Sequence, residues 1–180
     1  MDFSLTDDQE LIRAAVAKVC ADYPDEYWAE RDQNHDFPWD FYNAMANAGW
    51  IGTAIPEAYG GSGMGITEAS LVLEEVAASG AAMNGATPLH LSMFGMEPVV
   101  KYGSEEMKQM YLPRVAAGEM HVAFGVTEPD AGTDTTSITT AAKREGDYYI
   151  VKGRKVWTTK ALQSELSLIH ISEPTRPLTI

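Results

Sequence analysis

The sequence has 180 residues, of which 45% are hydrophobic, enough to bury one core and the beginning of a second. Its formal net charge of -13, from 26 acidic and 13 basic residues, argues against nucleic acid or an anionic membrane as the main partner. Cys20 is the single cysteine, which excludes an intramolecular disulfide and a cysteine-based metal cluster.

The opening residues 1–4 show neither the basic and apolar regions of a secretory signal nor the arginine-rich pattern of a transit peptide. No stretch of the sequence approaches the roughly 20 apolar residues that a membrane span requires. We therefore expect a soluble, cytoplasmic protein without a membrane span.

The first part of the chain carries helix signals. Thr6 and Gln9 have the form of a capping box, and apolar residues follow at helical spacing, which predicts a helix from about Thr6 to Asp22. Similar start and stop signals predict further helices over 25–33, 38–49, 67–80, 98–102 and 104–118, the last capped by Ser104.

The segment 55–65 is too rich in glycine and proline to be helical, so we expect a loop. Its glycines do not have the G-x-G-x-x-G spacing of a dinucleotide-binding loop, and no buried apolar strand leads into them. A surface turn between helices is the favoured interpretation.

After Glu119 the composition changes to valine, threonine, isoleucine and tyrosine, with turn signals at 145–147 and 152–154. The change predicts consecutive short strands and a domain boundary near Gly118. The predicted fold class is thus α+β multidomain, with an all-helical domain over 1–118 and the first strands of a small β-domain over 119–165.

The tail has a different character. Residues 166–176, Leu-Ser-Leu-Ile-His-Ile-Ser-Glu-Pro-Thr-Arg, resemble the in-frame translation of a transposase-type sequencing-library adapter. We therefore expect residues 166–180 to be foreign to the natural protein, assign His170 no function, and leave the tail out of fold reasoning. Reads from the source genome are expected to run on from Gln163 into a longer open frame.

Three ordered motifs resemble the acyl-CoA dehydrogenase family. Residues 124–134, Phe-Gly-Val-Thr-Glu-Pro-Asp-Ala-Gly-Thr-Asp, resemble the family's T-E-P-x-A-G-S-D signature, and 146–149 and 153–159 follow in the family's order. Three weaker matches precede them, at 5–12, 55–61 and 103–113. Together the matches cover most of residues 1–163.

The resemblance implies a helical domain, a small middle β-barrel domain and a carboxy-terminal helical bundle, which we expect this chain to lack. It also implies an FAD held between the β-domain and the bundle, an acyl-CoA substrate, an electron-transferring flavoprotein as electron acceptor, and a homodimer or homotetramer. The chain as it stands is expected to be inactive.

The resemblance also assigns individual residues. Thr127 and Thr159 match residues that hydrogen-bond the flavin ring, and Trp157 matches an aromatic residue that packs on it. Thr133 stands where the family usually has serine, at a place that touches flavin and the CoA portion of the substrate. The cofactor-binding set is Phe124, Val126, Thr127, Thr133, Trp157, Thr158 and Thr159.

Other residues receive weaker assignments. Glu128 and Asp134 are loop carboxylates, which are usually solvated or cap a turn, so neither is assigned to catalysis. No catalytic residue is expected in this chain, because the family's base is a glutamate in the carboxy-terminal region. Lys160 departs from the family's usual asparagine.

Two further groups stay open between function and plain structure. Basic residues around the predicted hairpin could meet CoA phosphates or face solvent, and apolar residues of the helical domain could line an acyl tunnel or form core. These residues are Lys143, Arg144, Arg154 and Lys155, and Met83, Leu89, Met93 and Met96.

The first functional hypothesis is therefore an acyl-CoA dehydrogenase. An acyl-CoA oxidase or nitroalkane oxidase on the same fold, which passes electrons to oxygen, is the second. A non-catalytic helical interaction module is the third, and the motif at 127–134 speaks against it.

Overall fold

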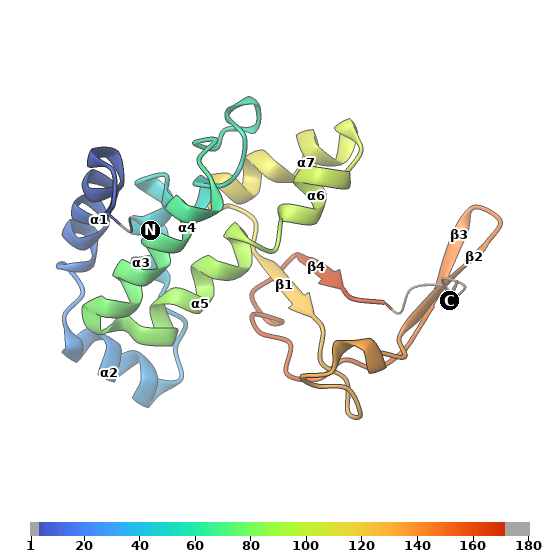
Figure 1. Ribbon diagram of the computed structural model, residues 1–180. Coiled ribbons are helices and arrows are strands. Elements are labelled where there is room, and N and C mark those ends of the chain that lie inside the picture. Colours follow the sequence, from blue (N-terminus) through green and yellow to red (C-terminus); the bar gives the residue numbers. More distant parts are fainter. Residues whose placement is uncertain (1–3, 172–180) are drawn as a thin grey trace. The chain divides into compact units, whose positions relative to one another are not determined.

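The computed structural model describes residues 4–171 of the chain. The chain divides into two compact units, Met1–His121 and Val122–Ile180 (Figure 1). The regular elements of residues 4–121 are helices, and strands begin in the second unit, which confirms the predicted α+β order.

The first helices follow their sequence signals closely. α1 (Asp7–Cys20) begins at the capping box, in which the Gln9 backbone N–H donates to the Thr6 hydroxyl and the Thr6 N–H donates to the Gln9 side chain. α2 (Asp25–Asn34) and α3 (Trp39–Asn47) occupy the predicted ranges, although Pro38 precedes α3 rather than forming its first residue.

Loop 55–65 joins α3 to the next helix, as predicted. It contains a short 3-10 helix, Glu57–Tyr59, and four of its backbone N–H groups donate to carbonyl oxygens of residues 52–55. α4 (Ile66–Val76) follows and packs against α1, where Arg13 and Glu75 form an ion pair with a 3.0 Å N–O distance. A π-helical turn, Ala77–Ala81, ends this part of the chain at Gly80, whose φ is 95°.

α5 (Ala82–Met93) was not predicted from the sequence. Its Gly85 and Pro88 are poor residues for a helix interior. Burial of Leu89 and Met93, which are 0% and 2% exposed, stabilises α5 in spite of them. Two shorter helices, α6 (Glu97–Tyr102) and α7 (Glu105–Ala116), complete the unit, and the Ser104 hydroxyl caps α7 by accepting from the Met107 N–H.

Residues 122–171, the described part of the second unit, contain two small sheets. β2 (Ala141–Glu145) and β3 (Tyr148–Lys152) form an antiparallel hairpin around the predicted turn at 145–147. β1 (Val122–Gly125) pairs in parallel with β4 (Leu166–Ile169).

The strand expected after the turn signal at 152–154 is absent, because residues 153–165 form bends and turns instead. β4 lies in the segment that resembles an adapter. Its apolar residues Leu166 and Leu168 alternate with Ser167, and such a pattern can pair with an exposed strand edge whatever its origin. The foreign origin of 166–180 therefore stays a prediction, and residues 172–180 of that tail lie outside the described residues.

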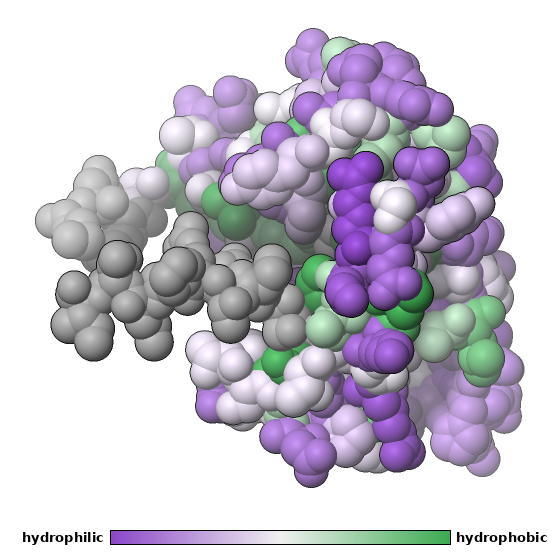
Figure 2. All heavy atoms as spheres, turned by 90° about the vertical axis from the view of Figure 1, so that its right-hand side faces the viewer, coloured by the Kyte–Doolittle hydropathy of each residue, from purple (hydrophilic) through white to green (hydrophobic). Residues whose placement is uncertain are grey.

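The face shown in Figure 2 is largely hydrophilic, and its hydrophobic residues form small patches separated by polar ones. Among residues 4–171, no helix is long and apolar enough to cross a membrane.

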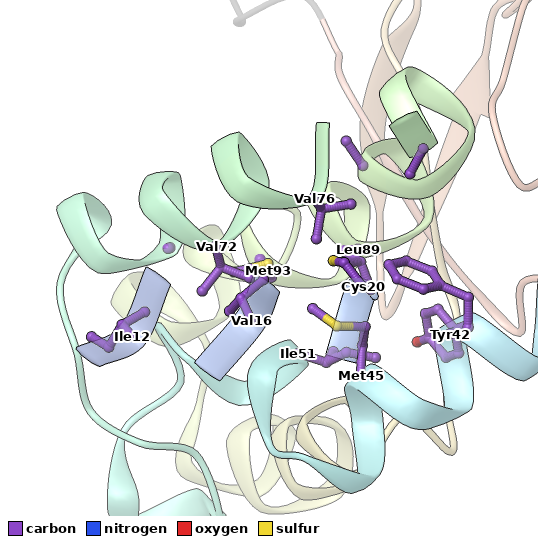
Figure 3. Packing of buried hydrophobic residues seen from close by; sticks show 14 of the residues in the cluster. Ile12, Val16, Cys20, Tyr42, Met45, Ile51, Val72, Val76, Leu89 and Met93 are labelled. Atoms are coloured by element: carbon purple, nitrogen blue, oxygen red, sulfur yellow. The ribbon is translucent and has the colours of Figure 1, made fainter. Parts of the chain in front are cut away.

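The core of the helical unit lies between α1, α3, α4 and α5 (Figure 3). Val16, Met45, Val72 and Leu89 contribute one fully buried side chain from each of these helices. Aromatic rings extend this core toward α2, where Trp28 meets Phe41 edge to face with ring centroids 4.9 Å apart. Leu89 and Met93 thus belong to the core, and Met83 is exposed.

Candidate cofactor site

β1 and the loop after it carry the first part of the predicted site. Val122 and Ala123 are buried, which anchors the strand. Phe124 is half-buried, and its ring meets that of His170 edge to face with centroids 4.7 Å apart. Val126 and Thr127 follow the strand and are also half-buried, so their side chains are partly accessible.

A second segment, 155–159, lies beside this loop. The Val156 N–H donates to the Thr127 carbonyl oxygen at 2.9 Å, and Lys155 Nζ donates to the Val126 carbonyl oxygen at 2.8 Å. Trp157 comes directly after Val156. The structure thus brings together two of the motifs on which the family resemblance depends.

Trp157 has an unusual conformation and an unusual exposure. Its φ of 58° lies in the left-handed region, which is rare for a bulky residue, and its side chain is 88% exposed. A backbone outlier of this kind is frequent at functional sites. Thr158 is half-buried and Thr159 is exposed. The turn therefore presents an indole ring and a hydroxyl group to solvent.

Thr133 lies apart from this pair of segments. It is in the exposed stretch that follows the backbone bridge between Glu128 and Ala131, just before the short 3-10 helix Thr135–Ser137. Its carbonyl oxygen accepts from the Thr135 N–H at 3.1 Å. The contacts found within residues 4–171 do not join Thr133 to Trp157, so its role toward flavin and substrate stays a prediction.

Glu128 is buried, not solvated as a loop carboxylate usually is, and the sequence interpretation missed this. Only 5% of the residue is exposed. Its carboxylate accepts from the backbone N–H and hydroxyl groups of Thr139 and Thr140 and from Lys155 Nζ, which lies 2.9 Å away. Thr139, Thr140 and Lys155 are far from Glu128 in the sequence, so no local motif indicates that they contact it.

These hydrogen bonds determine the charge of Glu128. The bond from the Thr140 hydroxyl contributes most, followed by the Thr139 N–H, and with Lys155 they hold the pKa of the carboxyl well below its usual range. A carboxylate with five donors around it has no free lone pair for a substrate proton. Glu128 is therefore unsuited to act as a base.

Asp134 caps a turn, which was one of the two roles expected for a loop carboxylate. Its carboxylate accepts from the Thr136 N–H at 3.1 Å, from the Thr136 hydroxyl and from the Ser137 hydroxyl at 2.7 Å. The same bonds, led by the Thr136 hydroxyl, lower the pKa of Asp134.

The basic residues near the hairpin do not form one cluster. Lys155 points inward to Glu128, with only 11% of its side chain exposed, so it is not available to CoA phosphates. Lys143 pairs with Glu145 on the exposed hairpin at 3.5 Å, and Arg144 Nε donates to the Gly146 carbonyl oxygen at 3.1 Å. Within the described part of the chain, no group of three or more His, Cys, Asp or Glu residues could hold a metal ion.

Two family models match the chain. The amino-terminal domain of acyl-CoA dehydrogenases matches residues 6–119, and the middle domain of acyl-CoA dehydrogenases matches residues 123–177. The chain belongs to the acyl-CoA dehydrogenase family. The middle-domain match runs into the segment that resembles an adapter.

Individual relatives support the same family. The chain is 34% identical over 173 residues to acyl-CoA dehydrogenase FadE12 of Mycobacterium tuberculosis, covering 93% of this chain and 42% of that protein. A glutaryl-CoA dehydrogenase structure in complex with glutaryl-CoA has a TM-score of 0.84 at 32% identity, covering 92% of this chain and 43% of that one.

A third similar chain comes from a structural study of the electron transferring flavoprotein of Acidaminococcus fermentans and the mechanism of flavin-based electron bifurcation. It has a TM-score of 0.82 at 33% identity, and the match covers 94% of this chain and 44% of that one. The chain thus spans less than half the length of the relatives that it matches.

Proposed function

We propose that this chain is part of a flavin-dependent acyl-CoA dehydrogenase that introduces an α,β double bond into an acyl-CoA thioester. The observation that carries this proposal is the pairing of loop 126–127 with segment 155–156, which places Trp157, whose ring is exposed, directly after a residue bonded to the Thr127 backbone. An exposed indole followed in the chain by the partly accessible Thr158 and the exposed Thr159 fits a flat, polar-edged ring such as the isoalloxazine of FAD.

The family resemblance suggests a role for each predicted residue. Trp157 would pack on the flavin and keep water from one side of it, with Phe124 and Val126 beside the same ring. Thr127, Thr158 and Thr159 would supply hydrogen bonds that stabilise negative charge on the reduced flavin. Thr133 would contact the substrate and the flavin from its exposed turn.

The flavin accepts the hydride that leaves the β-carbon of the substrate. A carboxylate must take the α-proton in the same reaction, and Glu128 cannot be that group because its lone pairs are occupied. We therefore propose that the base comes from a part of the protein beyond this chain, and that the chain alone is inactive. Partners would be an electron-transferring flavoprotein and further copies of the complete protein.

The proposal is tested on the complete protein. The source locus is sequenced past codon 163, the complete frame is expressed, and the visible absorption spectrum of the purified protein is recorded. We expect a flavin spectrum that an acyl-CoA bleaches anaerobically. Fast reoxidation by air would instead indicate an oxidase on the same fold, and a complete protein without flavin would refute the proposal.

A pair of aromatic variants tests the site itself. Trp157→Ala is expected to weaken FAD binding by roughly tenfold, the effect of losing one well-packed aromatic contact. Tyr148→Ala is the control, because Tyr148 is 79% exposed on the hairpin and has no predicted contact with the cofactor. Equal FAD affinity in the two variants would remove Trp157 from the site.

A further inference from the structure

The Glu128 carboxylate lies where three separate stretches of the second unit meet. Glu128 itself belongs to the loop after β1. The three residues that donate to its carboxylate are Thr139 and Thr140, just before β2, and Lys155. All of these donors approach one carboxylate that is 4% exposed at the side chain. One buried anion thus holds together segments that are distant in sequence.

Lys155 connects this carboxylate to the candidate cofactor site. Its Nζ donates both to Glu128 Oε1 at 2.9 Å and to the Val126 carbonyl oxygen at 2.8 Å. The next residue, Val156, donates its N–H to the Thr127 carbonyl oxygen at 2.9 Å. The backbone on either side of Thr127 is therefore fixed by bonds that depend on where Lys155 lies.

We propose that Glu128 and Lys155 are positioning residues that hold Thr127 and Trp157 in register for the flavin. This inference depends on the proposed function, because it assigns a role in arranging that same cofactor site. Neither residue touches the reacting atoms. They act by fixing the loop that carries Thr127 against the turn that carries Trp157.

Because Glu128 and Lys155 form a buried ion pair, a neutral residue in place of Glu128 should not hold Lys155 in position. A buried ammonium ion without its carboxylate is costly, so Lys155 would turn toward water and release the Val126 carbonyl oxygen if Glu128 were neutral. An amide at this place would also point an NH₂ group at donors of Thr139 or Thr140. Glu128→Gln should therefore loosen the site while keeping the shape of the side chain.

Four variants of the complete protein test this role. Glu128→Gln and Lys155→Met break the buried pair, and Glu145→Gln breaks the exposed pair with Lys143, whose distance is 3.5 Å. Ile138→Val is a stability control, because it removes one methylene from a side chain that is 8% exposed and has no part in the ionic network.

The first measurement is hydrogen exchange at the Val156 amide, which does not require flavin. Glu128→Gln and Lys155→Met are expected to speed this exchange by about tenfold or more, since the Thr127 acceptor is no longer held in place. Glu145→Gln is expected to leave it unchanged. If the Val156 amide exchanges equally in Glu128→Gln and Glu145→Gln, the positioning role is refuted, even when the protein binds no flavin.

The second measurement is FAD binding and the visible spectrum of the bound flavin. Glu128→Gln and Lys155→Met should raise the dissociation constant of FAD by roughly tenfold and shift the flavin absorption bands, because the groups around the ring move. Ile138→Val should lower the melting temperature without moving these bands. Bands that stay at their wild-type positions in Glu128→Gln would contradict the inference, and a wild-type protein without flavin would refute the proposed function alone.

Discussion

Gly61 is a position where a single added methyl group should be poorly tolerated. A Cβ atom there would lie 2.0 Å from the Ile55 carbonyl oxygen and 2.6 Å from the Gly52 carbonyl oxygen. Both neighbours are backbone atoms, so the loop itself would have to open. The same two oxygens accept from the Gly63 N–H at 2.9 Å and from the Ser62 and Ile55 N–H groups at 3.0 Å.

The expected cost of Gly61→Ala follows from those bonds. Opening the loop disrupts three hydrogen bonds of about 1 kcal/mol each, so the free energy of unfolding should fall by about 3 kcal/mol. Gly60→Ala is the matched control. Gly60 has a φ of 80° but nothing within 4 Å of its added Cβ, so only the left-handed backbone costs energy there, about 1 kcal/mol.

Urea unfolding of the chain, followed by far-ultraviolet circular dichroism, measures both variants under the same conditions. We expect Gly61→Ala to be less stable than Gly60→Ala by about 2 kcal/mol. Equal stability of the two variants would show that loop 55–65 is not closed as described.

Three more predictions concern burial and charge. Phe41→Ala should lower the free energy of unfolding by about 3–5 kcal/mol in urea titrations, because Phe41 is 0% exposed; a loss below 1 kcal/mol would contradict its place in the core. Burial lowers the pKa of Lys160 from 10.5 to about 8, so the free energy of unfolding should rise as the pH increases between these two values. Lys160→Met should abolish this rise and increase the free energy of unfolding at pH 7 by about 1–3 kcal/mol. Hydrogen bonds lower the pKa of Glu128 from 4.5, so the stability that they provide is complete above about pH 5 and falls as the pH drops below 4.5. Glu128→Gln should weaken this loss of stability at acid pH, measured as the melting temperature of the second unit against pH.

The sequence predicted those parts of the fold that depend on neighbouring residues. The capping box of Thr6 and Gln9 and the Ser104 cap are local, so the starts of α1 and α7 could be predicted. α5 could not, because its Gly85 and Pro88 argue against a helix and only the core explains it. An added Cβ on Gly85 would lie 3.1 Å from the Trp28 ring, so that glycine allows a close approach between helices.

The candidate site shows the same limit. Its motifs could be recognised in the sequence, but the conformation of Trp157 was predicted as a strand and is a left-handed turn residue with an exposed ring. Glu128 was interpreted as a solvated or turn-capping carboxylate, because its partners Thr139, Thr140 and Lys155 are distant in sequence. Burial and long-range pairing are properties of the folded unit, and one sequence does not show them.

We propose that this chain is part of a flavin-dependent acyl-CoA dehydrogenase. The most direct test is the visible absorption spectrum of the protein expressed from the complete frame at the source locus, recorded anaerobically before and after addition of an acyl-CoA. We expect a flavin spectrum that the thioester bleaches. A complete protein that purifies without flavin would contradict it.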